Sequence, residues 1–346
     1  MTILERLRAT GIHRTGSPAR GFRYRRADGR RVSAADRARI EALKIPPAWK
    51  DVVIHASAAG RVQAMGRDRA GRWQYLYHER HVAERERRKS ERLLHFAEAL
   101  PRMRQQVARD LRRPGMPREK ALACILRILA TCFLRPGSQV YADENKSYGI
   151  ATVRRQHVTV QGDLVRFDFP GKSGQRQQRE LRDRAVARIV RQLLRVPGRE
   201  VFKYLDEEGK PVDIRRRHIN EYIKEVMGER FSAKDFRTWA GTLICACALA
   251  RAGADPAESR TARRKKVVQA IRETAEQLGN TPAICRSSYI EPTVLSSYER
   301  GRVVSRHFET VEELILHRGH RHHPAERALL ALLRRRATKV RARRAA

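Results

Sequence analysis

The sequence predicts an α+β fold, in which a small amino-terminal β-sheet domain precedes a larger, mostly α-helical domain with an inserted β hairpin or sheet. Three observations predict it: strand-like alternation before about residue 82, long helical stretches after it, and a return of alternation at residues 150–171. A chain of 346 residues is long enough to bury a substantial core. We expect domains at residues 1–82 and 83–316, and a basic helical tail at residues 317–346.

The first segment is rich in strand signals. Residues 51–55, 61–65 and 72–77 alternate between apolar and polar side chains, and turn signals at Ala59-Gly60 and Arg69-Ala70-Gly71 separate them. Successive side chains of a strand point to opposite faces, so this alternation is typical of β structure. We therefore expect a small sheet module of three short strands.

Long helical stretches begin near His81. We expect one helix over residues 81–100, a break at Pro101 and a second helix over residues 102–113, because a proline inside a helix removes a backbone hydrogen bond. Residues 118–135 follow and are apolar on almost every side. This pattern indicates a helix buried in the core.

Strand-like alternation returns at residues 150–171, where Gly162-Asp163 has the composition of a hairpin turn. Helical patterns then resume, including a helix that ends at Leu278 just before Gly279. The final stretch, PAERALLALLRRRATKVRARRAA at residues 324–346, begins as an amphipathic helix and ends as a basic tail. We expect it to be a solvated tail that adds nonspecific contacts to phosphates.

The chain is strongly basic along its whole length. It carries 75 Lys and Arg against 38 Asp and Glu, a formal net charge of +37. Such a charge attracts polyanions, and nucleic acid is the natural partner because each neutralised phosphate releases condensed counterions. An anionic membrane is the rival partner, but no run of about 18 apolar residues and no secretory leader is evident.

The cysteines indicate a reducing compartment. They are odd in number, lack a CxxC pair and lack a matching histidine spacing, so neither a disulfide framework nor a zinc site is expected. We expect a cytoplasmic, nucleoid-associated protein without a membrane anchor. The five cysteines are Cys124, Cys132, Cys245, Cys247 and Cys285.

The segment that carries chemistry is LGNTPAICRSSYIEPTVLSSY, which contains Tyr289. A lone tyrosine near a helix is usually a packing residue. Three basic positions in FLRPGSQVY, FPGKSGQ and SAKDFRTWAGT change this interpretation, because Arg135, Lys172 and Arg237 precede the tyrosine in that order. These four ordered motifs, over residues 85–300, resemble the catalytic domain of type IB DNA topoisomerases, with the spacing of the compact viral and bacterial enzymes.

The resemblance implies a reaction in which the phenol of Tyr289 attacks a DNA phosphate and forms a 3′-phosphotyrosine. A free phenol has a pKa of about 10 and needs help to attack. Arg135 and Arg237 would neutralise the charge that grows on the phosphate oxygens, and Lys172 would protonate the leaving 5′-oxygen as the general acid. Positive and negative supercoils would relax while one strand of the double-stranded DNA is cut.

One position departs from the family. The residue nine before the tyrosine is usually a histidine that donates a hydrogen bond to a phosphate oxygen, and here it is Asn280. An asparagine amide still donates but carries no charge, so we expect the same reaction class with weaker stabilisation. The alternative is that Asn280 only continues the helix cap that begins at Gly279.

The resemblance also implies DNA contacts outside the catalytic set. The segments KIPPAWKDVVI and MGRDRAGRWQYLYH resemble the amino-terminal module of the compact enzymes, in which Gln74, Tyr75 and Tyr77 would face the major groove. Lys234 and Tyr141 match further positions near the DNA. A clamp of two lobes around double-stranded DNA, formed by a monomer, would suit this layout.

No cofactor is expected. The sequence has no GxxxxGK[ST] segment for a nucleotide and no cluster of Asp and Glu suited to Mg²⁺.

Two alternative functions remain open. A tyrosine recombinase shares the nucleophile and both arginines but typically carries HxxR, where this chain has KxxR from Lys234 to Arg237. A noncatalytic, nucleoid-type DNA-binding protein would use the charge alone and bury Tyr289 as a core residue.

Overall fold

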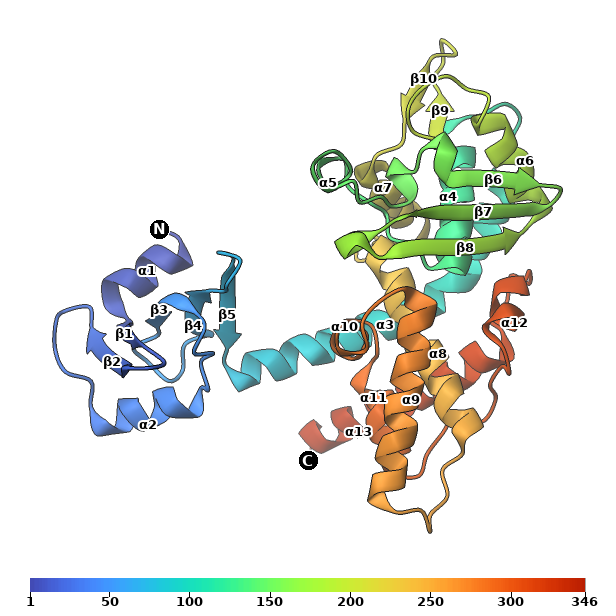
Figure 1. Ribbon diagram of the computed structural model, residues 1–346. Helices are drawn as coiled ribbons and strands as arrows, with labels where there is room; N and C mark the ends of the chain where they lie inside the picture. The colour runs from blue at the N-terminus through green and yellow to red at the C-terminus, as the bar shows by residue number, and fades with distance from the viewer. Residues whose placement is uncertain (346) are drawn as a thin grey trace. The chain divides into compact units, whose positions relative to one another are not determined.

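The computed structural model describes residues 1–345, with side chains up to residue 335. The chain forms two compact units, Met1–Lys89 and Ser90–Ala346, which are described separately (Figure 1). Their division falls inside the long helix α3 (Glu79–Asp110), somewhat after the expected boundary at residue 82. The boundary between the two units therefore lies inside a continuous helix and not at the residue where that helix begins.

The first unit is a five-stranded antiparallel sheet with the strand order β2-β1-β3-β4-β5. The three predicted strands are present as β3 (Lys50–Ile54), β4 (Val62–Arg67) and β5 (Trp73–Tyr77). Two strands were not predicted, β1 (Ile12–Ser17) and β2 (Gly21–Arg26). Strand β2 has no fully buried residue, and only Phe22 and Tyr24 alternate with its arginines, which is too short a pattern to predict a strand.

Two short helices cover the two faces of this sheet. Helix α2 (Ala34–Ala42) contributes Ile40 to a cluster with Ile12 and Ile54, and helix α1 (Ile3–Thr10) contributes Leu7 to a second cluster on the other side. Because adjacent residues of β3 fall into different clusters, both faces of this strand are buried.

Helix α3 runs without interruption through Pro101, so the predicted break is wrong. A proline at this position cannot donate to the carbonyl of Ala97, four residues earlier. That carbonyl instead accepts a hydrogen bond of 2.7 Å from Nε2 of His322, near the other end of the chain. The helix continues because a side chain from a distant segment replaces the lost donor.

The second unit is built around helix α4 (Arg118–Cys132), the predicted core helix, which is buried on almost all sides. It packs against α6 (Arg184–Leu193), α7 (Arg216–Met227) and α8 (Ala233–Ala252). This prediction is confirmed, since a helix with apolar residues all round has no face for solvent.

A three-stranded antiparallel sheet, in the order β6-β7-β8, packs against α4 (Figure 1). The predicted hairpin is formed by β6 (Val158–Gln161) and β7 (Leu164–Pro170), with Gly162 at a φ of 54° in the turn. The sequence pattern missed β8 (Arg176–Arg182), whose polar residues hide its pairing with β7. A short ribbon follows, made of β9 (Lys203–Leu205) and β10 (Pro211–Asp213).

The remaining helices complete the second unit. They are α5 (Gln139–Asn145), α9 (Arg260–Leu278), α10 (Pro282–Ser288), α11 (Pro292–Tyr298), α12 (Val311–Leu316) and α13 (Pro324–Ala345). Three short 3-10 turns, η1 (Ile150–Thr152), η2 (Arg155–His157) and η3 (Lys172–Gly174), lie between them.

The expectation of a solvated tail at residues 317–346 is wrong for its described side chains. Helix α13 buries Ala325, Glu326 and Leu329, and it packs against α8 and α11. The predicted amphipathic start of this helix is confirmed, and its apolar face packs on the core instead of facing solvent. The basic side chains after residue 335 lie outside the described ones. None of the described helices is long and apolar enough to cross a membrane.

Candidate active site

Arg237 occupies the centre of the site and is almost completely buried, with 2% of its surface exposed. It lies in the second turn of α8 and donates hydrogen bonds to two carbonyls, those of Phe133 and Leu278. These carbonyls belong to the carboxyl ends of α4 and α9, where unpaired backbone oxygens carry partial negative charge. The guanidinium is thus held by two helix ends and needs no carboxylate partner.

Tyr289 lies directly against this guanidinium. The Cζ atom of Arg237 is 4.9 Å from the centroid of the Tyr289 ring, a cation–π contact. Tyr289 caps the carboxyl end of α10, and its backbone carbonyl accepts a hydrogen bond of 3.2 Å from Thr242 of α8. A Cβ atom at Gly241 would lie 3.1 Å from the Cβ of Tyr289, so a glycine allows α8 to approach this closely.

The electrostatic environment changes the pKa of both groups. Burial alone would raise the pKa of the Tyr289 phenol, but the positive charges of Arg237, Arg135 and Lys234 outweigh it and the pKa is lowered. Burial, with a smaller effect of Arg135, lowers the pKa of Arg237 to about 10, and it remains charged at neutral pH. The cluster of cations therefore favours the phenolate form of Tyr289.

Arg135 and Asn280 are in contact. The Nη2 atom of Arg135 donates to Oδ1 of Asn280, and the backbone N–H of Asn280 bonds to Ala275 at 2.9 Å. With Gly279 at a φ of 57° and bonded to Glu276, these bonds form a Schellman cap on α9. The capping interpretation of Asn280 is therefore confirmed for its backbone, while its side chain faces the arginine.

The amide nitrogen of Asn280 has no hydrogen-bond partner in the described part of the chain, although this atom is buried. A guanidinium only donates, so Oδ1 must face Arg135 and Nδ2 must point elsewhere. A buried donor without an acceptor is costly unless a ligand supplies one. The side chain is thus prepared to donate to an anion placed beside Arg135.

Lys172 is exposed on the turn between β7 and β8. No hydrogen bond among the described residues joins it to the other four candidate catalytic side chains. Its hairpin is tied to the end of α9, since Arg179 of β8 donates to the carbonyl of Gln277 at 2.9 Å and the Gln177 side chain lies against Gly279. The structure therefore anchors the base of the hairpin at the site and leaves its lysine in solvent.

Arg179 was missed by the sequence analysis. Burial and the nearby charge of Arg135 lower its pKa, and its Nε has no partner within the described residues. The available signal was its place in β8, two residues from the buried side chains of Gln177 and Leu181 on the same face. An arginine on the inward face of a strand indicates a site rather than a solvated surface.

The predicted DNA-contacting residues are distributed over both units. Lys234 and Tyr141 are exposed on α8 and α5 of the second unit. In the first unit, Tyr75 and Tyr77 share one face of the edge strand β5, and their rings stack with centroids 6.1 Å apart. Gln74 points to the opposite face, where its amide donates to Asp68 at 2.9 Å.

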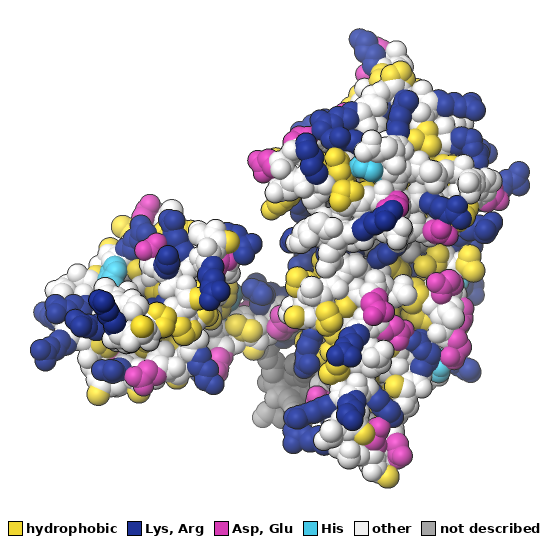
Figure 2. Space-filling view, viewed as in Figure 1, with side chains coloured by type: hydrophobic (Ala, Val, Ile, Leu, Met, Phe, Trp, Pro, Cys, Tyr) yellow, Lys and Arg dark blue, Asp and Glu magenta, His cyan; other side chains and the backbone are white. Residues whose placement is uncertain are grey.

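Positive charge covers much of the surface outside the site. Figure 2 shows Lys and Arg side chains spread over the visible face of each unit, with fewer acidic side chains between them. Among the side chains that the structure describes, no three His, Cys, Asp or Glu residues gather into a group that could hold a metal ion.

The second unit carries a tyrosine surrounded by arginines, and the first unit is a separate β domain. Comparison with known protein families identifies the class of protein that has these features. The family model described as the catalytic core of eukaryotic DNA topoisomerase I matches residues 78–309. The model described as the amino-terminal domain of bacterial DNA topoisomerase IB matches residues 21–68.

Individual relatives agree with the family models. The DNA topoisomerase 1B of Acanthamoeba polyphaga mimivirus is 33% identical over 294 residues, 84% of this chain and 88% of the relative. The DNA topoisomerase I of Monkeypox virus and the DNA topoisomerase 1B of Vaccinia virus (strain Copenhagen) are each 25% identical over 267 residues, 74% of this chain and 80% of each relative. The chain belongs to the type IB DNA topoisomerases, enzymes of the isomerase class.

Proposed function

We propose that this enzyme relaxes positive and negative supercoils in double-stranded DNA by cutting one strand through a 3′-phosphotyrosine at Tyr289. The observation that carries the proposal is the contact of the buried Arg237 guanidinium with the Tyr289 ring. A structural tyrosine gains nothing from a lowered pKa, whereas a nucleophile gains a larger phenolate fraction at neutral pH.

The site residues have distinct roles in the proposed reaction. Tyr289 attacks the phosphorus as the phenolate, the bond to the 5′-oxygen breaks, and Lys172 gives a proton to that leaving oxygen. Arg135 and Arg237 stabilise the negative charge on the nonbridging oxygens, and Nδ2 of Asn280 donates to one of them. Resealing is the reverse reaction, in which the 5′-hydroxyl attacks the phosphotyrosine and returns its proton to Lys172.

The proposed reaction needs neither ATP nor a metal ion. The energy of the broken phosphodiester stays in the phosphotyrosine bond, so no external source is required for resealing. Contacts from Lys234, Tyr141, Gln74, Tyr75 and Tyr77 are proposed to hold the DNA. The enzyme is proposed to act as a monomer in the cytoplasm.

A plasmid relaxation assay tests the proposal. The protein should relax supercoiled plasmid in EDTA without ATP, and Tyr289→Phe should abolish both relaxation and the covalent DNA adduct while DNA binding persists. Mass spectrometry of the trapped adduct should place the phosphate on Tyr289. A noncatalytic DNA-binding protein predicts instead that Tyr289→Phe changes nothing, and strand exchange between two DNA sites would indicate a recombinase.

A further inference from the structure

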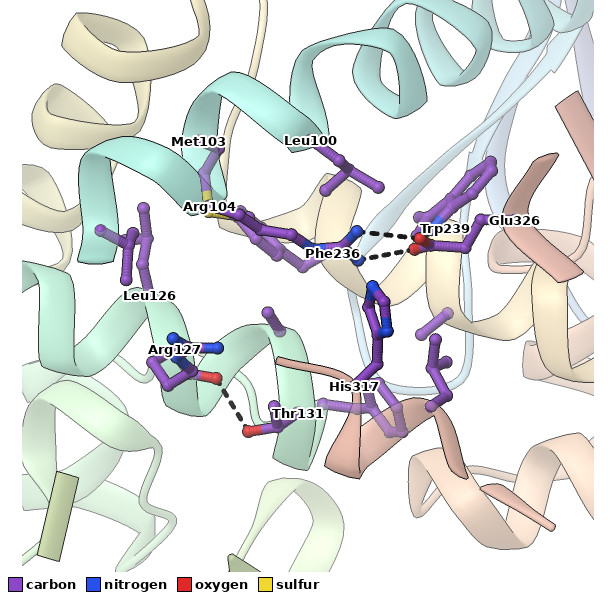
Figure 3. A pocket seen from close by; sticks show the side chains of 15 residues that line it. Leu100, Met103, Arg104, Leu126, Arg127, Thr131, Phe236, Trp239, His317 and Glu326 are labelled. Carbon is purple, nitrogen blue, oxygen red and sulfur yellow. Dashed lines mark hydrogen bonds and ion pairs between the residues drawn. The ribbon is translucent and has the colours of Figure 1, made fainter. Parts of the chain in front are cut away.

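The carboxyl-terminal segment from residue 310 onward lies beyond the part of the chain that matches the catalytic-core family model. It is nevertheless built into the second unit by a carboxylate, Glu326, which is 1% exposed. Glu326 lies in the first turn of α13 and contacts both α3 and α8 (Figure 3). This connection reaches the helix that carries Arg237.

The carboxylate of Glu326 is fully used. Its Oε1 atom accepts from Nη2 of Arg104 at 2.8 Å and from the indole N–H of Trp239 at 3.2 Å. Its Oε2 atom accepts from Nη1 of Arg104 at 2.9 Å and from the backbone N–H of His323 at 2.8 Å. Burial alone would raise the pKa of Glu326, but these donors outweigh burial and lower it, so the group is ionised. A buried charge with four donors has one geometry and resists displacement.

Apolar packing on this side of α8 is incomplete. A cavity of about 50 Å³ is lined by Phe236, Trp239 and Ala240 of α8, together with Arg104 and Glu326 (Figure 3). Cavity walls lack the contacts that would otherwise resist small movements of a helix. The hydrogen bond that Trp239 donates to Glu326 therefore restrains the position of α8 where close packing is absent.

Movement of α8 at this point would be transmitted to the site. Trp239 is two residues after Arg237 on the same helix, and Phe133, whose carbonyl holds the Arg237 guanidinium, lines the same cavity. Backbone hydrogen bonds make a helix turn or slide as one body over such a short span. A shift of Trp239 would thus displace Arg237 relative to Tyr289.

We propose that Glu326 is a positioning residue. It fixes the rotation of α8 about its helix axis and its position along that axis, and so places Arg237 against the reacting phosphate. This inference rests on the proposed function, because it assumes that Arg237 acts in DNA cleavage. The carboxyl-terminal segment is then part of the machinery that aligns the active site. Its role is mechanical, and Glu326 itself touches no DNA.

The test is a double-mutant cycle on the rate of single-turnover cleavage at saturating DNA. Glu326→Gln keeps the shape of the side chain and removes its charge, and it should slow cleavage about tenfold with an unchanged Kd for DNA, since small misplacements of reacting groups are costly. In the Arg237→Ala background the same substitution should slow cleavage by less than about twofold, because there is no arginine left to misplace.

Two further variants guard against a general loss of stability. Glu98→Gln removes an exposed ion pair, Glu98 with Arg334, which joins the same helices α3 and α13, and it should leave cleavage unchanged. Trp239→Phe keeps an aromatic ring but removes the indole N–H that donates to Glu326, together with part of the ring that lines the cavity, and it should slow cleavage in the same direction as Glu326→Gln. The comparison uses first-order rate constants of single-turnover cleavage, which do not depend on the amount of folded enzyme.

The outcomes separate the two proposals. An equal slowing by Glu326→Gln in both backgrounds would mean that Glu326 only supports the fold, and the positioning role would be wrong while the proposed function stands. If Arg237→Ala alone leaves cleavage unchanged, the catalytic role of Arg237 fails, and the positioning inference fails with it.

Discussion

Arg237 and Tyr289 form the part of the site in which one side chain changes the chemistry of another. Among the described residues, the guanidinium is hydrogen-bonded to the carbonyls of two helix ends, whose partial charges offset its charge incompletely, so much of its field remains available to the phenol and to a phosphate. Asn280 adds a donor without a charge, held in one orientation by Arg135. In these three side chains, the orientation of each hydrogen-bond donor matters as much as the number of positive charges.

The pH dependence of cleavage should report the lowered pKa of Tyr289. The rate should rise with pH as the phenolate forms and level off below the ordinary phenol pKa of about 10. Because Arg135 is one of the charges that lower this pKa, Arg135→Gln should raise it and move the rising limb to higher pH. Single-turnover cleavage measured across the pH range checks both, and an unmoved limb would mean that Arg135 does not act on the phenol.

The donor role of Asn280 can be tested with an isosteric variant. Asn280→Asp keeps an oxygen facing Arg135 but replaces the Nδ2 donor with a second acceptor, which would repel a phosphate oxygen. Cleavage should slow by about 100-fold or more, as for loss of one preorganised donor. Asn280→His restores a donor and should retain activity. Equal rates for both variants would show that the side chain only supports the cap of α9.

At the scale of elements, the β7–β8 hairpin and helix α9 form one structural unit. Strand β8 is tied to the end of α9 through Arg179 and Gln277, whereas the turn that carries Lys172 is exposed. Because the base of the hairpin is fixed to α9 and its turn is exposed, Lys172 can reach a bound phosphate while β7 and β8 stay paired. The hairpin thus suits a general acid that acts only when DNA is present.

Replacing this lysine should slow strand cleavage, because the leaving 5′-oxygen would lose its proton donor. Lys172→Ala should slow cleavage of ordinary DNA by about 100-fold to 10,000-fold, the usual contribution of a general acid. A substrate with a 5′-bridging sulfur should restore cleavage, because a thiolate leaves without a proton. Arg176→Ala, in the same hairpin, removes an exposed ion pair with Asp168 and serves as the control. Failure of the sulfur substrate to rescue cleavage would exclude Lys172 as the acid.

At the scale of the whole molecule, a net charge of +37 remains after every Asp and Glu has been counted, and Lys and Arg side chains are spread over both units. Even if every acidic side chain is paired with a cation, this surplus stays available for phosphates. Charge of this kind sets affinity and association rate without selecting a sequence.

Affinity for duplex DNA should therefore fall steeply with salt. Neutralisation of several phosphates predicts a loss of about a thousandfold or more between roughly 50 and 200 mM monovalent salt. The Tyr289→Phe variant, which cannot cleave, allows binding to be measured by itself by fluorescence anisotropy. A Kd that changes little over this range would contradict the charge argument.

Local sequence patterns were sufficient for much of the fold. The three strands β3 to β5, the core helix α4, the β6–β7 hairpin and the end of α9 at Gly279 were all predicted, because alternation, apolar periodicity and turn residues act over a few positions. The missed strands β1, β2 and β8 are polar on their exposed faces. Strands β2 and β8 are held by pairing with the strand just before each of them, β1 and β7, and this pairing is not written in their own polar residues.

The order of the motifs around Arg135, Lys172, Arg237 and Tyr289 by itself determined the family and the candidate nucleophile. Only the tertiary structure decided how Arg237 is buried, why α3 passes through Pro101 and how the carboxyl-terminal segment is joined to α8. In each case the deciding partner lies far away in the chain. Local patterns report which side chains are apolar, but a buried polar group is stable only when a particular distant donor or acceptor reaches it.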